Sequence, residues 1–194
     1  MWLGYLLVAD FGLAKFVTEG ELANSFCGTA EYLAPEMLIG NGHDYTIDWW
    51  ALGILIYEMI VGIPPFFHKN KNKMYHFIKE SKVNFPDPDR HKIFVSDDAK
   101  DIILRLLDKN KRTRLGANGV EEIMAHRFFA DINIDKLMSK QLVPPYKPTI
   151  SEDLAYFDPK LTQQTGEITE SILPAQQRAI INAGQHNFKG FSSS

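Results

Sequence analysis

Three carboxylates in apolar surroundings are the first candidates for chemistry in this 194-residue sequence. Asp10 follows the apolar stretch 5–9, and Asp48 and Glu58 are the acids of the otherwise apolar run 48–62. A charge among apolar side chains costs free energy unless it is paired. Glu58 is therefore better explained by binding than by stability, with a private structural ion pair as the alternative. Asp48 is expected near a helix start, where a carboxylate satisfies unpaired backbone N–H groups.

Two tripeptides enclose a long polar loop. D-F-G occupies residues 10–12, A-P-E occupies residues 34–36, and the loop covers residues 15–31. A single D-F-G is a weak signal, because any junction between a strand and a turn can contain it. A loop this long inside a compact domain is usually functional. D-F-G and A-P-E are the two ends of the activation segment in protein kinases.

Longer motifs make this resemblance specific. The sequence reads D-F-G-L-A-K from Asp10, S-F-C-G-T-A-E-Y-L-A-P-E-M from Ser25 and D-W-W-A-L-G-I-L-I-Y-E-M from Asp48. Together these motifs resemble the C-lobe of AGC-group serine/threonine kinases, the relatives of protein kinases A, B and C. The resemblance covers nearly the whole chain and implies an ATP-dependent kinase that uses Mg²⁺.

The resemblance implies a role for each residue that matches a family motif. Asp10 would hold the Mg²⁺ that bridges the phosphates of ATP, although a turn-capping Asp is the alternative. Ser25 would be the activation-loop phosphosite, served by an upstream activating kinase, with Lys15 near its phosphate. A solvated loop serine is the alternative for Ser25. Thr29 would contact the catalytic Asp and Lys of a complete kinase.

Other matches concern the substrate. Gly28, Thr29 and Ala30 match the loop that receives the residue after the phosphoacceptor, although the family often has proline at the position of Ala30. Glu58 matches an acid that binds a substrate arginine. Protein substrates with basic residues before the Ser or Thr are therefore expected.

Three further residues match structural positions of the family. The resemblance implies a buried ion pair between Glu36 and Arg114, and breaking such a pair from one side costs of order 3–5 kcal/mol. It also implies that Asp48 anchors the catalytic loop from the central helix.

The tail of the chain resembles the AGC C-terminal extension. V-P-P-Y-K-P begins at residue 143, and F-K-G-F-S begins at Phe188. The resemblance implies a turn-motif phosphosite at Thr169, with Ser171 as a nearby competitor, and a regulated phosphosite at Ser192. Phe188 and Phe191 would form the hydrophobic motif that, in this family, binds a pocket on the kinase N-lobe. The combination is most similar to the branch of protein kinase B, S6-kinase and serum/glucocorticoid-regulated kinase.

The resemblance implies a mainly α fold, a kinase C-lobe, around a buried central helix at 48–62. That run is apolar on all sides, too short to span a bilayer and too long for a buried strand. We predict a kinase domain over residues 1–129 and an extended AGC C-terminal domain over residues 130–194. The other predicted elements are a buried strand at 5–9, helices at 34–38, 70–80 and 120–126, a break at 85–89, and an amphipathic helix capped by Ser96.

Composition excludes several other functions. A net charge of -3 and a pI near 6.1 do not support nucleic-acid binding. The single Cys27 excludes an internal disulfide framework, and the six histidines contain no H-x-x-x-H pair. The apolar residues 1–9 lack the charged start of a signal peptide, and we find no membrane segment. The expected location is the cytoplasm, with entry into the nucleus left open.

Several kinase motifs are not found in the sequence. These are the Gly-rich loop, the V-A-I-K lysine, the αC glutamate and the H-R-D catalytic loop. Phosphoryl transfer depends on those parts, so we expect the chain to be inactive alone. The chain is then either part of an active kinase or a non-catalytic homologue that acts as an interaction module or decoy.

Overall fold

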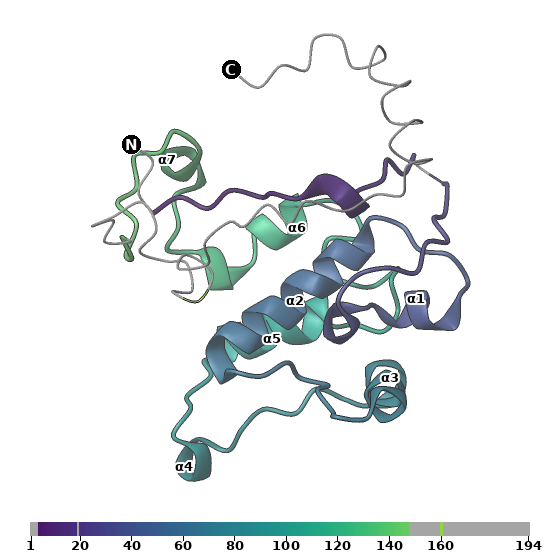
Figure 1. The fold of residues 1–194 in the computed structure, drawn as a ribbon. Coiled ribbons are helices and arrows are strands. Elements are labelled where there is room, and N and C mark those ends of the chain that lie inside the picture. The colour runs from purple at the N-terminus through teal and green to yellow at the C-terminus, as the bar shows by residue number, and fades with distance from the viewer. Residues whose placement is uncertain (1–3, 19, 148–159, 161–194) are drawn as a thin grey trace. The chain divides into compact units, whose positions relative to one another are not determined.

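The computed structural model describes residues 4–18, 20–147 and 160. The regular elements of these residues are helices, with no strand among them. This confirms the predicted mainly α fold. The chain divides into two compact units, Met1–Pro145 and Tyr146–Ser194. None of the described helices is long and apolar enough to cross a membrane. The elements, labelled in part in Figure 1, are η1 (Phe11–Leu13), η2 (Ala30–Tyr32), α1 (Pro35–Ile39), α2 (Thr46–Val61), α3 (Lys71–Glu80), α4 (Pro88–His91), α5 (Asp97–Leu106), α6 (Glu121–Met124), η3 (Arg127–Phe129) and α7 (Ile134–Met138).

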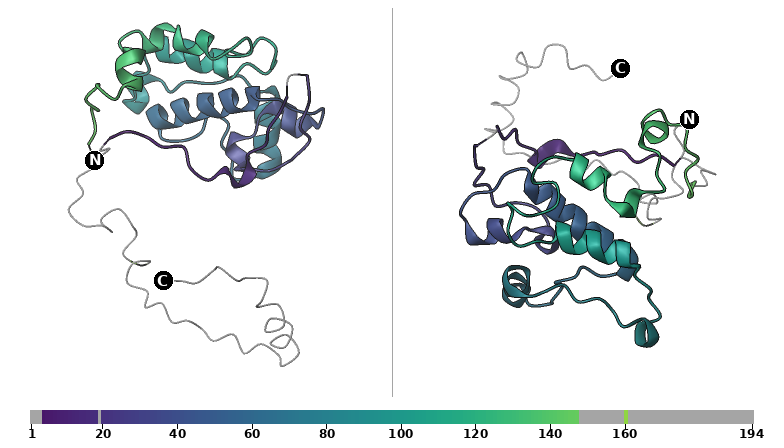
Figure 2. Two further views of the ribbon diagram at one scale, coloured as in Figure 1. Left: turned by 90° about the horizontal axis from the view of Figure 1, so that it is seen from above. Right: turned by 180° about the vertical axis from the view of Figure 1, so that it is seen from behind.

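The central helix predicted at 48–62 is α2, which lies beside α5 at the centre of the first unit (Figures 1 and 2). The two helices approach closely at Gly53, where a Cβ atom would lie only 2.9 Å from the Cβ of Leu106. A larger residue there would push the helices apart. The helix ends as predicted at Gly62, whose N–H donates to the carbonyl of Glu58 at 2.8 Å.

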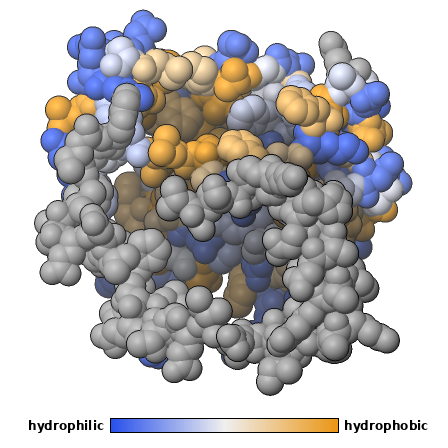
Figure 3. Space-filling model, turned by 45° about the horizontal axis from the view of Figure 1, so that its top comes forward, coloured by the Kyte–Doolittle hydropathy of each residue, from blue (hydrophilic) through white to orange (hydrophobic). Residues whose placement is uncertain are grey.

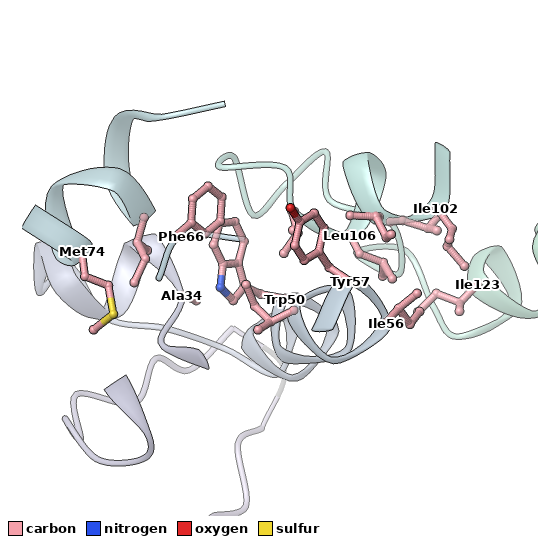
Figure 4. Close-up of a cluster of buried hydrophobic side chains, with 14 residues drawn as sticks. Ala34, Trp50, Ile56, Tyr57, Phe66, Met74, Ile102, Leu106 and Ile123 are labelled. Carbon is pink, nitrogen blue, oxygen red and sulfur yellow. The ribbon is translucent and has the colours of Figure 1, made fainter. Parts of the chain in front are cut away.

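A single cluster of buried apolar side chains joins α2 to its neighbours (Figure 4). Trp50 is fully buried and stacks on Phe66, with ring centroids 5.8 Å apart and planes at 11°. Burying one large apolar side chain stabilises a fold by roughly 1.5–3 kcal/mol. The cluster contains Ala34, Trp50, Ile54, Ile56, Tyr57, Phe66, Met74, Ile78, Ile102, Ile103, Leu106, Leu107, Leu115 and Ile123.

Side-chain caps explain where two of the helices begin. Ser96 accepts a hydrogen bond from the N–H of Ala99 at 3.2 Å, so the predicted cap of α5 is present. Asn70 caps α3 by accepting from the N–H of Lys73 at 3.1 Å. These polar groups satisfy backbone donors that have no partner inside the helix.

The buried strand predicted at 5–9 is wrong. These residues lie outside any helix or strand, and Leu6, Leu7 and Val8 are 99%, 89% and 85% exposed. A strand needs a neighbouring backbone for its hydrogen bonds, and no described segment pairs with this one. Figure 3 shows apolar areas among hydrophilic ones on the surface of the described residues.

The prediction that α2 is enclosed on all sides also needs correction. Six of its residues are buried, but Leu55 and Met59 are 42% and 69% exposed. They lie four residues apart, on one side of the helix. No described element covers that side.

Candidate active site

A cavity of about 740 Å³ brings together five of the site residues predicted from the sequence. It lies between the segment that contains η1, the loop before η2 and the first turn of α2. The site residues that line it are Asp10, Lys15, Ser25, Gly28 and Asp48. Residues separated by up to 38 positions along the chain therefore share one hollow.

Asp10 has an unusual backbone conformation at this cavity. Its φ of 63° and ψ of 73° lie in the left-handed region, which few residues other than glycine adopt. Its Oδ1 accepts a hydrogen bond from the N–H of Gly12 at 3.2 Å, so Asp10 does cap the turn. No hydrogen bond to Oδ2 is present among the described residues. Backbone strain of this kind is concentrated at functional sites.

The carboxylate of Asp10 is a suitable ligand for Mg²⁺. Mg²⁺ prefers oxygen ligands and is usually bound by one or two carboxylates together with the phosphates of a substrate. Within the described residues, no group of three or more His, Cys, Asp or Glu side chains could hold a metal. A single carboxylate such as that of Asp10 fits an ion that it shares with the phosphates of a nucleotide.

Asp48 does not cap α2 as predicted. Asp44 takes that role, because its Oδ1 accepts from the N–H of Thr46 at 3.1 Å. Asp48 has no hydrogen bond to a described residue, and burial at the cavity raises the pKa of its carboxyl, whereas the nearby His43 lowers it. A charged group with solvent access and no partner is available for contacts with another segment.

His43 fixes the polar loop to the start of α2. The backbones of His43 and Ala23 exchange two hydrogen bonds of 2.8 and 2.9 Å, and both residues are buried. This isolated antiparallel bridge holds the loop that contains Ser25. The sequence analysis missed His43, since a lone histidine in a polar loop gives no signal of this pairing.

Lys15, Ser25 and Thr29 are exposed, and no described residue forms a hydrogen bond or ion pair with their side chains. Gly28 has a φ of 114°, a conformation that disfavours any residue with a Cβ atom. The nearest atom to a Cβ built there is 3.8 Å away. Backbone conformation rather than lack of space therefore explains the glycine in this loop.

Glu58 pairs with a phenol rather than with a cation. The hydroxyl of Tyr32 donates to Oε2 of Glu58 at 2.6 Å. This hydrogen bond, helped by burial and by the charge of Glu58, raises the pKa of Tyr32 to about 12. Glu58 forms no ion pair with a described residue, so the alternative of a private ion pair finds no partner here. Tyr32 was missed because nothing in the spacing links it to Glu58, 26 positions away.

The expected contact between Glu36 and Arg114 is present. Two hydrogen bonds of 2.7 and 3.0 Å join the guanidinium to both oxygens of Glu36. Arg114 also donates to the carbonyls of Thr46 at 3.0 Å and Asp108 at 3.1 Å, and it is 1% exposed. The pair therefore ties α1 to the start of α2 and to the segment after α5.

Four predicted site residues lie outside the described residues. They are Thr169, Phe188, Phe191 and Ser192. Their assignments therefore remain predictions.

Comparison with known proteins decides the family. Residues 3–129 match the model of the protein kinase domain. The chain belongs to the protein kinase family. Over 194 residues it is 43% identical to the serine/threonine protein kinase ypkA of Aspergillus fumigatus. The aligned region covers 98% of this chain and 29% of that protein.

Two more kinases support the AGC resemblance. The chain is 42% identical to the serine/threonine-protein kinase gad8 of Schizosaccharomyces pombe over 84% of this chain and 28% of that protein. It is 39% identical to the human ribosomal protein S6 kinase alpha-6 over 98% of this chain and 24% of that protein. These homologues are AGC-group kinases, as the motifs predicted. The 194-residue chain spans less than a third of the length of each of these relatives.

Proposed function

We propose that this chain contributes the Mg²⁺-binding and substrate-binding parts of an ATP-dependent serine/threonine kinase. The observation that carries the proposal is the strained, exposed carboxylate of Asp10 at a cavity shared with Ser25, Gly28 and Asp48. Bound Mg²⁺-ATP would supply the phosphoryl group. Asp10 would hold the ion, and the loop at Gly28 would position the substrate backbone.

Glu58 and Tyr32 support a preference for basic substrates. The hydrogen bond from Tyr32 fixes the direction of the Glu58 carboxylate, and it leaves Oε1 available to a substrate guanidinium. Glu31 places a second negative charge near Tyr32. A guanidinium forms strong, directional hydrogen bonds with a carboxylate held in this way.

Ser25 and Lys15 support regulation at the same cavity. Both side chains are exposed, and both line the hollow that contains Asp10. A phosphate on Ser25 would add almost two negative charges, which Lys15 can attract. An upstream kinase would thereby order the segment that carries Asp10. The same reasoning leaves Thr169 and Ser192 as proposed phosphosites of the tail, and Phe188 and Phe191 as its ligands for an N-lobe pocket.

A second candidate is a non-catalytic binding protein. Two pairs of neighbouring exposed apolar residues favour it, Leu6 with Leu7 and Leu55 with Met59, because exposed apolar patches mark interaction sites. In both cases we expect the purified chain alone to show no peptide phosphorylation above a blank. Turnover that disappears in Asp10→Ala would contradict that expectation.

The native protein distinguishes the two candidates. An antibody raised against residues 160–185 would first give its size, compared with 22.1 kDa for this chain. The protein captured by that antibody would then be assayed with Mg²⁺-ATP, a serine peptide that carries arginines, and a matched peptide with alanines. A larger protein that prefers the arginine peptide supports the kinase. A band at the size of this chain, with no activity, supports the binding protein.

A further inference from the structure

The segment from His68 to Lys82 is strongly basic. It contains five lysines and one acid, Glu80, in a chain whose net charge is -3. It includes the whole of α3 and the turns on both sides. We refer to its lysines as the lysine face: Lys69, Lys71, Lys73, Lys79 and Lys82.

The residues of α3 that enter the core are apolar, whereas most of the lysine face is exposed. Met74 and Ile78 of α3 are 1% and 0% exposed and belong to the apolar cluster. Four of the five lysines are exposed, and Lys79 is half-buried. The buried apolar residues of α3 are therefore used by the fold, and its exposed lysines remain for solvent or a partner.

The lysine face is not neutralised within the described residues. None of its five lysines forms an ion pair with a described carboxylate. The one acid of the segment, Glu80, acts on Lys109, where its charge favours the protonated amine. Exposed like charges on one short segment repel one another, and a bound anionic partner would relieve that repulsion.

The position of α3 indicates where that anion belongs. The helix packs against α1 (Figure 1), which begins five residues after the substrate loop at Ala30. Through α1, α3 therefore belongs to the same packed region as the segment that follows the substrate loop. Glu58 and Tyr32, by contrast, present a negative site on α2 and η2.

Two other classes of polyanion fit less well. Insertion of a basic helix into a membrane requires an apolar face that enters the lipid. Met74 and Ile78 are buried in the core, so only the weaker surface attraction to anionic lipid would remain. Nucleic-acid binding is favoured by a domain with an excess of positive charge, whereas this chain has a net charge of -3. An acidic segment of a protein remains.

We propose that the lysine face is a docking surface for a segment of a protein substrate that is rich in Asp and Glu. Such a substrate would carry basic residues near its phosphoacceptor, for Glu58, and acidic residues farther along its chain, for α3. The identity of the partner as a substrate rests on the proposed kinase function, but binding of an acidic peptide does not. The negative site at Glu58 and the positive lysine face would together fix the direction in which a substrate lies.

Binding can be measured on the full 194-residue chain without catalysis. The probe is a short fluorescein-labelled peptide of alternating glutamate and glycine, and its matched control has glutamine in place of glutamate. We expect fluorescence anisotropy to show binding of the glutamate peptide that weakens as salt is added. The triple variant Lys69→Glu, Lys71→Glu, Lys73→Glu should weaken binding roughly tenfold or more, because each reversal replaces attraction by repulsion.

A second triple variant controls for net charge. Arg90→Glu, Arg112→Glu and Lys136→Glu change exposed residues outside the lysine face by the same total charge. This variant should bind the peptide within roughly twofold of the parent chain. Circular dichroism would establish that both variants fold, as expected because Met74 and Ile78 are unchanged.

Three results would overturn the proposal. One is equal binding of the glutamate and glutamine peptides, and another is equal loss of binding in both triple variants. The third is tighter binding to phosphatidylserine vesicles or to a single-stranded oligonucleotide than to the glutamate peptide. None of these results depends on phosphoryl transfer, so each leaves the proposed kinase function to its own test.

Discussion

The surroundings of Arg114 and those of Asp10 differ in how completely this chain determines them. Arg114 is almost fully buried and donates hydrogen bonds to a carboxylate and two carbonyls from separate parts of the chain. Asp10 is exposed, and its one hydrogen bond among the described residues comes from its own turn. The pair of Glu36 and Arg114 is therefore fixed by this chain, whereas Asp10, the proposed Mg²⁺ ligand, lies on a segment with few contacts.

This difference separates stability from function in the same domain. The fold around Glu36 and Arg114 is completed by elements that the structure describes. The segment 5–18 is held at few points, including the hydrogen bond from the Tyr5 hydroxyl to the carbonyl of Leu142 at 2.7 Å. Local stability follows the number of buried contacts, so substitutions in the two regions should have very different effects.

The largest effect should come from Arg114→Ala. Removal of the guanidinium leaves Glu36 buried without its partner, so the free energy of unfolding should fall by about 3–5 kcal/mol. Urea denaturation followed by circular dichroism measures this change. Arg112→Ala, two residues away and exposed, is the matched control and should shift the midpoint very little. Equal shifts in the two variants would contradict the central role of the pair.

The second-largest effect should be the difference in stability between substitutions of apolar residues in the two regions. Ile102→Ala creates a cavity in the fully buried cluster and should lower the free energy of unfolding by about 2–5 kcal/mol. Leu6→Ala removes a side chain that is 99% exposed and should change it by less than about 0.5 kcal/mol. A large loss in Leu6→Ala would mean that segment 5–9 is packed in solution.

Lys109 gives the core region a dependence on pH. Its Nζ lies 3.9 Å from the ring centroid of Phe66 and donates to the carbonyl of Ile78. Burial lowers the pKa of Lys109 from 10.5 to about 8. Between these two values the unfolded chain holds a proton that the folded chain has released, so raising the pH favours folding.

The comparison with Lys109→Met isolates this contribution. The free energy of unfolding of the parent chain, relative to this variant, should rise from pH 8 to pH 10.5. The same comparison with the exposed Lys136→Met should stay flat. A flat result for Lys109 as well would show that the rings of Phe66 and Trp50, 3.9 and 4.9 Å from its Nζ, and the carbonyl of Ile78 keep its amine protonated.

The smallest effect should occur at the hydrogen bond between Tyr32 and Glu58. The folded pKa of Tyr32, about 12, exceeds its ordinary value of 10.0. The phenol therefore stabilises the folded chain below pH 10, and this contribution is lost as the pH rises through about 12. In Glu58→Gln, ultraviolet titration should show one more tyrosine that ionises near its ordinary pKa.

Glu31→Gln is the control for Tyr32, because Glu31 acts on its pKa through charge alone. That variant should shift the titration less than Glu58→Gln does. Tyr32→Phe identifies the tyrosine concerned. Identical titrations in the parent chain and in Glu58→Gln would contradict the hydrogen bond that is proposed to orient Glu58 for a substrate guanidinium.

Sequence patterns predicted well where a residue's role depends on its near neighbours. The apolar run at 48–62 gave α2 to within two residues at its start, and Ser96 was identified as the cap of α5. Helices satisfy their own backbone hydrogen bonds, so periodicity and caps are enough to place them. The motifs around Asp10 and Glu36 were enough to indicate the family, which the kinase-domain match then showed.

Only the tertiary structure decided roles that depend on distant residues. A strand at 5–9 needs a partner backbone, and periodicity alone does not show whether one exists. Asp44 rather than Asp48 caps α2, and Tyr32 rather than a cation meets Glu58. The sequence alone indicated helices α1, α2, α3, α5 and α6, the family and the candidate residues, because those follow from local pattern and motif, whereas α4 and α7 were not predicted. Burial, charge pairing and the shared cavity were decided by the fold, because they depend on which distant side chains come within a few ångströms of one another.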